Sequence, residues 1–91
     1  MGKIDIKVKM VSAVTEVLKF KKENPRANYE QSLQHISNIV KKEKNQYIKL
    51  GMVSSASKAL SILEREPRLK DKDVMRKIVD ELPKILEKID K

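Results

Sequence analysis

Residues 50–63 read LGMVSSASKALSIL, and this segment decides the fold class that the sequence predicts. If it is a helix, with about 100° between successive residues, six apolar side chains fall within about 120° of arc: Met52, Val53, Ala56, Ala59, Leu60 and Leu63. The opposite face carries three serines and Lys58, which is the only charged residue of the fourteen. So little charge indicates a helix with neighbours on more than one side.

The start of this helix repeats a pattern found forty-two residues upstream. Residues 48–54, IKLGMVS, match residues 6–12, IKVKMVS, and the ungapped match continues to a Pro-Arg pair in both copies. Over this stretch, eight of twenty-one positions are identical. We therefore predict an internal duplication, with repeat units at about 4–44 and 46–86. Its period is similar to that of helical-hairpin repeats such as HEAT and armadillo units, although their consensus residues are absent.

Each predicted unit consists of a helix, a proline-marked turn and a second helix. In the first unit, Asn24 before Pro25 offers one start for the second helix. Asn28 with Gln31 forms a capping-box pattern and offers a later start. The apolar stripe of this helix breaks at two charged residues, so we expect it to end near Asn45.

In the second unit, Asp71 is predicted to cap the last helix. The apolar pattern of that helix continues past Pro83, which removes one backbone hydrogen bond. We therefore expect a kink near Val79 to Leu82.

The first helix carries a competing signal at its start. Residues 3–9, KIDIKVK, alternate polar and apolar side chains, which is the period of a strand. The segment QYIKLGM, residues 46–52, corresponds to residues 4–10 in the repeat and shows no such alternation. We therefore predict a helix here, and a strand added to a partner is the alternative.

These elements predict an all-α fold: residues 1–91 form a single helical domain, an antiparallel four-helix bundle of two duplicated hairpins. The two first helices are expected to pack together, because Val14 and Val17 of one unit correspond to Ala56 and Ala59 of the other. Large side chains facing small ones allow two helices to interdigitate.

Composition limits the classes of function. The net charge is +8, which favours partners that carry negative charge. There are no cysteines, and no apolar run approaches the roughly 20 residues that a membrane-spanning helix needs. We expect a soluble, cytoplasmic chain.

Few residues suggest catalytic or metal chemistry. His35, the single histidine, is expected to face solvent and has no ligand partners at metal spacing. Ser55 and Lys58 have a Ser-x-x-Lys spacing similar to that of serine β-lactamases, but the further motifs of those enzymes are missing. Gly51 is isolated, and Lys9 at the equivalent position indicates that glycine is not required there. We predict no catalytic residues, no cofactor and no metal site.

Basic residues near the two Pro-Arg turns are the best candidates for a binding site. In an antiparallel bundle both turns lie at one end, which gathers eight cations: Lys19, Lys21, Lys22, Arg26, Arg65, Arg68, Lys70 and Lys72. Such a cluster could contact phosphates or other anions. Acidic residues lie in the same region: Glu23, Glu64, Glu66, Asp71 and Asp73. Tyr29 is expected to face the core, which disfavours a platform for base stacking.

The resulting functional prediction is a small, non-enzymatic helical interaction module that binds a protein partner or forms a homodimer. The first helices are apolar over more than one face, and this surplus surface must be core or interface. The alternative is a basic nucleic-acid-binding bundle that uses the cationic Pro-Arg end. A third possibility is a membrane-surface or immunity-type role, because the size, charge and helicity resemble those of small basic four-helix bacteriocin immunity proteins.

Overall fold

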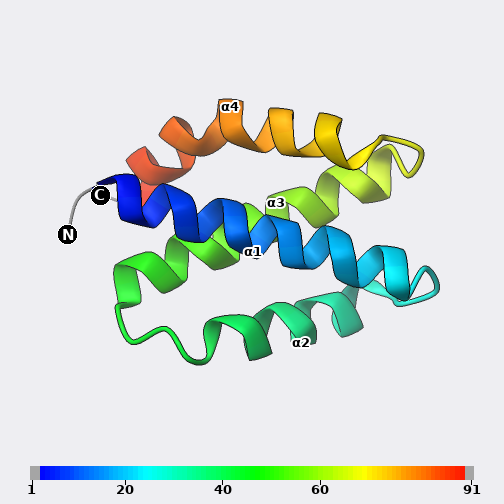
Figure 1. The fold of residues 1–91 in the computed structure, drawn as a ribbon, viewed down its shortest axis with the longest axis horizontal. Helices are drawn as coiled ribbons and strands as arrows, with labels where there is room; N and C mark the ends of the chain where they lie inside the picture. Colours follow the sequence, from blue (N-terminus) through cyan, green and yellow to red (C-terminus); the bar gives the residue numbers. More distant parts are fainter. Residues whose placement is uncertain (1–2, 90–91) are drawn as a thin grey trace.

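The computed structural model describes residues 3–89 and contains four helices joined by short turns (Figure 1). The helices are α1 (Lys3–Glu23), α2 (Tyr29–Val40), α3 (Gln46–Arg65) and α4 (Asp71–Ile89). No strand occurs within residues 3–89. The all-α prediction is therefore confirmed, and the alternating residues 3–9 form the first turns of α1.

The helices are arranged around a central pair. Helices α1 and α3 run side by side in the same direction, and α2 and α4 lie on opposite flanks, each antiparallel to its hairpin partner (Figure 1). Both central helices contact all three others, whereas α2 and α4 do not touch each other within the described residues. The fold measures 36 × 26 × 19 Å. Both Pro-Arg turns lie at the same end, as predicted, while the duplication itself stays a prediction.

The α1–α3 interface is the tightest part of the core. Val14 and Val17 of α1 and Ala56 and Ala59 of α3 are all buried, which agrees with the predicted packing of these two helices. The fully buried Ser55 hydroxyl lies within hydrogen-bonding distance of the Met10 carbonyl in α1 (3.3 Å) and of the Gly51 carbonyl in its own helix (2.9 Å). Small side chains therefore let the two helix backbones approach closely.

Gly51 contributes to this close approach. A Cβ atom at this position would lie 3.0 Å from Ile6 Cδ1 and 3.2 Å from Met10 Cγ. Glycine fits because α1 crosses α3 at this point, whereas the equivalent Lys9 is exposed on the outside of α1. A side chain here would crowd α1, and the expectation that glycine is not structurally required stays a prediction.

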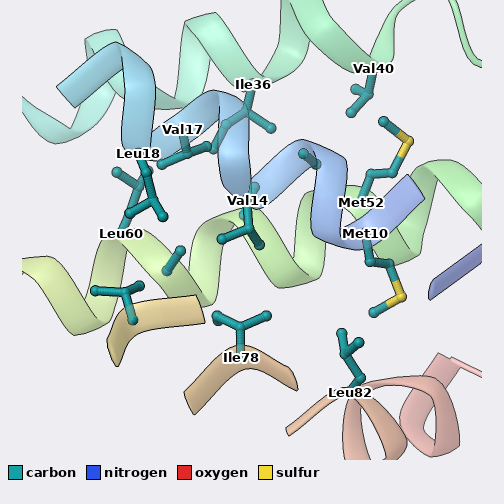
Figure 2. Packing of buried hydrophobic residues seen from close by; sticks show 14 of the residues in the cluster. Met10, Val14, Val17, Leu18, Ile36, Val40, Met52, Leu60, Ile78 and Leu82 are labelled. Carbon is teal, nitrogen blue, oxygen red and sulfur yellow. The ribbon is translucent and has the colours of Figure 1, made fainter. Parts of the chain in front are cut away.

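The flanking helices close the core with one apolar stripe each. Ile36 and Val40 of α2 are buried on one side, and Val74, Ile78, Leu82 and Leu86 of α4 on the other. Figure 2 shows the Met52 side chain reaching toward Val40 and the Met10 side chain reaching toward Leu82. Each fully buried aliphatic side chain of this size contributes about 1.5–3 kcal/mol through the hydrophobic effect.

The start of α2 distinguishes the two predicted caps. The Asn24 backbone N–H donates to the Phe20 carbonyl (2.8 Å), so Asn24 closes α1 and does not begin α2. The Asn28 side chain accepts from the Gln31 N–H (2.7 Å), and the Gln31 side chain accepts from the Asn28 N–H (2.9 Å). The capping-box start is therefore right, and the start at Pro25 is wrong.

The end of α2 differs from the prediction. The helix ends at Val40, and residues 41–45 form the loop to α3. Asn45 is the N-cap of α3, and its side chain accepts from the Ile48 N–H (3.2 Å). The predicted end near Asn45 is therefore wrong, because it included the loop 41–45 in the helix.

Two predictions concern α4. The predicted N-cap, Asp71, is wrong by one residue, because Asp71 is the first residue of the helix. The Lys70 carbonyl accepts the first helical hydrogen bonds, from the N–H groups of Asp73 and Val74. The helix continues through Pro83, and its C-terminal turns bend toward the beginning of α1 (Figure 1). A bend in this part of the helix agrees with the predicted effect of the proline.

Candidate functional site

A hollow of about 320 Å³ opens between the two Pro-Arg turns. We call it the central hollow. Its apolar lining comes from both halves of the chain: Leu18, Pro25, Leu60, Leu63, Pro67 and Leu69. The two turns thus face each other across apolar side chains that the core does not fully cover.

Polar and charged groups surround the central hollow. The Lys21 ammonium donates to the Ala27 carbonyl (2.7 Å) and joins the end of α1 to the following turn. Tyr29 lies in the lining with 40% of its surface exposed, so the expectation that it faces the core is wrong. Tyr29 is the first residue of α2, and the buried position belongs to Ser32, whose hydroxyl donates to the Asn28 carbonyl (3.1 Å).

A second hollow of about 370 Å³ lies next to the first, between α1 and α4. We call it the α1–α4 groove. Its apolar lining includes Leu18 and Met75, and its charged residues are three lysines and one aspartate: Lys19, Lys22, Lys72 and Asp71. These side chains favour an anionic, partly apolar ligand.

The two hollows share three lining residues: Leu18, Lys22 and Asp71. The Lys22 ammonium lies 3.3 Å from the Asp71 carboxylate, and both side chains are largely exposed. Such exposed ion pairs contribute at most about 1 kcal/mol to stability. The pair therefore lies at the boundary between the two hollows and stabilises that boundary only weakly.

The eight predicted cations are divided among several surfaces. Lys21 and Lys22 line the central hollow, and Lys19, Lys22 and Lys72 line the groove. Arg26 lies in a separate hollow beside Phe20, and Arg68 lies beside Pro67 on the other turn. Arg65 and Lys70 are exposed where α3 ends and α4 begins. The fold thus brings three of the eight to one groove and spreads the others around the same end.

Most of these cations lack an acidic partner. Among the side chains that the structure describes, seven form no ion pair with a carboxylate: Lys19, Lys21, Arg26, Arg65, Arg68, Lys70 and Lys72. Of these, Lys21 donates to a backbone carbonyl instead. Glu66, one of the acidic residues of this end, pairs with Lys77 of α4 (3.3 Å). The end of the bundle that carries both Pro-Arg turns, which we call the proline end, therefore presents cations that are free to meet an external anion.

At the opposite end of the bundle, Glu43 connects the loop before α3 to α1. Glu43, in the loop before α3, accepts from the Asn45 backbone N–H (3.1 Å) and lies 3.4 Å from the Lys9 ammonium. The pKa of the Glu43 carboxyl is lowered chiefly by this backbone hydrogen bond and further by Lys9, against an opposing effect of desolvation. We call this region the loop end.

Two sequence candidates have structural roles. His35 does not point freely into solvent: it is half-buried and stacks on Phe20, with ring centroids 4.3 Å apart and ring planes at 18°. This contact joins the end of α1 to α2, and no short-range pattern in the sequence signals it. Ser55 lies fully buried against α1, which leaves its hydroxyl inaccessible to a substrate.

Several apolar side chains remain exposed outside the core. Leu50 and Val53, one turn apart on α3, are 53% and 36% exposed, and Val8 of α1 is 61% exposed. The placement of Val53 in the buried arc of its helix is therefore wrong. The α1-facing side of α3 is taken by Gly51 and Ser55, and this leaves Val53 on the outer side.

The fold and these surfaces define a small all-α protein with an open, cationic end. No helix within residues 3–89 is long and apolar enough to cross a membrane. The side chains that the structure describes contain no acidic or histidine cluster suited to a metal ion. Comparisons with protein-family models, curated proteins and solved structures find no match.

Proposed function

We propose that this chain is a small, non-enzymatic helical interaction module that binds a protein partner or its own copy. The observation that carries the proposal is the pair Leu50 and Val53 on the outer face of α3. The buried cluster that holds the four helices together does not include them.

Their spacing favours a contact surface. Single exposed apolar residues are common on soluble proteins. Leu50 and Val53, however, lie three residues apart on one helix, so their side chains are neighbours. Full burial of an exposed leucine or valine yields about 1.5–3 kcal/mol. Leu50 and Val53 are already partly covered, so each contributes a fraction of this value to an association.

The test is sedimentation over a wide range of protein concentration, with and without Leu50→Lys and Val53→Lys together. Val79, exposed on α4, provides the matched control Val79→Lys. A mass that rises with concentration in the wild type and control, but not in the double variant, supports self-association. If the wild type is monomeric throughout, cross-linking to cell extract must yield a partner that the double variant loses. Failure of both experiments overturns the proposal.

Nucleic-acid binding is the second candidate, and the observation that favours it is the set of unpaired cations at the proline end. The test is titration of labelled duplex DNA and RNA at about 50 and 200 mM salt. Contacts to several phosphates lose about a thousandfold or more in affinity between these two concentrations. Arg26→Gln with Arg68→Gln should then weaken binding, whereas absence of binding at low salt rejects this candidate.

A further inference from the structure

We propose that the central hollow and the α1–α4 groove together dock an acidic peptide segment that carries one bulky apolar side chain. This inference rests on the proposed role as an interaction module and specifies the chemistry of a partner. Its site lies at the proline end, distinct from the exposed pair on α3.

The central hollow supplies the apolar half of the site. Its volume of about 320 Å³ lies at the lower limit of ligand pockets, about 300–1,000 Å³. That space suits one large side chain and is too small for a helix. Leu63 and Leu69 are only half-buried, so an inserted side chain would cover apolar surface that water now contacts.

The groove supplies the charged half. Lys19 and Lys72 both line it, and neither has a carboxylate partner among the described side chains. The net charge of +8 adds a long-range attraction for an acidic segment. Carboxylates of the peptide would therefore meet complementary charge immediately beside the apolar hollow.

The two halves are continuous. Leu18 lines both hollows, and the Lys22–Asp71 ion pair lies at their boundary. A carboxylate of the peptide can replace Asp71 as the partner of Lys22 at little expense, because the existing pair is exposed to water. The geometry thus fits an apolar anchor in the central hollow with acidic residues next to it in the groove.

The probe is a blocked decapeptide with one tryptophan flanked by glutamates, compared with the same peptide carrying lysines in place of the glutamates. The protein contains no tryptophan, so the fluorescence of the peptide reports its surroundings alone. We expect saturable binding with a blue shift for the acidic peptide and none for the basic one. Leu63→Gln should weaken binding and reduce the shift.

Charge variants locate the site. Lys19→Glu with Lys72→Glu should lower the affinity by about tenfold or more, since two favourable charge contacts become repulsive. Lys41→Glu with Lys42→Glu, in the exposed loop at the opposite end, changes the net charge equally and should leave binding within about twofold. Circular dichroism establishes that each variant is folded.

Three results would overturn this site: no blue shift with the acidic peptide, equal weakening by both charge variants, or lysine-dependent binding to anionic lipid vesicles in the absence of peptide binding. The third result would assign the groove to a lipid surface. Association through Leu50 and Val53 does not require Lys19 or Lys72. A chain that still associates but ignores the peptide therefore refutes the docking site alone and leaves the interaction module intact.

Discussion

The loop end and the proline end of this bundle are built from the same four helices but are packed differently. At the loop end, Gly51 brings α3 against Ile6 and Met10, and Glu43 ties the loop to α1. At the proline end, Leu18 lines two open hollows. The comparison shows that α1 and α3 pack closely at the loop end, whereas the proline end leaves apolar and cationic surface available for binding.

The same truncation at the two ends tests this difference most strongly. Met10 is completely buried between helices, so Met10→Ala should leave a closed cavity and lower the free energy of unfolding by about 3 kcal/mol. Leu18→Ala should lower the free energy of unfolding by about 2 kcal/mol, because the enlarged hollow opens to water. Urea denaturation of both variants measures the values. An equal or larger loss for Leu18→Ala would contradict the comparison.

Adding side-chain volume at the loop end should also lower the free energy of unfolding, but by less than Met10→Ala does. Gly51→Leu places a side chain against Ile6 and Met10 and should cost about 2 kcal/mol by forcing α1 and α3 apart. In Gly51→Ala, the gain in helix propensity of about 1 kcal/mol opposes the crowding of a single methyl group, so the net change should be small. Thermal denaturation of the series measures the crowding, and a fully stable leucine variant would show that the helices separate easily.

Much of the fold follows from the sequence. Apolar periodicity locates four helices and correctly buries Met52, Ala56, Ala59 and Leu60. It fails at Val53 because hydrophobicity does not reveal that Gly51 and Ser55 occupy the helix contact. Close approach of two backbones selects small residues, and a pattern of apolar side chains does not detect them.

The candidate site is predictable only in part. The paired Pro-Arg turns correctly place the cations at one end of the bundle. Their distribution depends on how each turn leads into the next helix, since α2 begins at Tyr29 and not at Pro25. That start places Tyr29 in the lining of the central hollow, and the three-dimensional path of the turns determines which lysines share a groove.

Helix capping should contribute more to the free energy of unfolding at the proline end than at the loop end, which is the reverse of the order expected for core packing. At the proline end, Asn28 and Gln31 exchange two hydrogen bonds, whereas Asn45 at the loop end accepts one longer bond from Ile48. Asn28→Ala should therefore lower the free energy of unfolding by about 1 kcal/mol, and Asn45→Ala by less. Asn28→Asp keeps an acceptor and serves as the control. A larger loss from Asn45→Ala, measured by urea denaturation, would show that the loop end dominates capping as well.

The smallest effect concerns the charge of Glu43 and is visible through pH. Since the folded state lowers the pKa of this carboxyl below its ordinary value of 4.5, the carboxylate stabilises the fold above that pH. This stabilisation is lost as the pH falls through the folded-state pKa. Glu43→Gln should therefore lower the melting temperature near neutral pH, and the difference from the wild type should vanish in acid.

Lys9→Gln separates the two causes of this shift. It removes the ammonium but keeps the hydrogen bond from the Asn45 N–H, which is the larger cause, so its effect should be smaller than that of Glu43→Gln. Melting temperatures of the three proteins from neutral to acidic pH provide the measurement. If the difference in melting temperature between Glu43→Gln and the wild type stays constant into acid, the Glu43 side chain acts through packing and not through its charge. The stability of the loop end would then come from the packing of Gly51 against its neighbours.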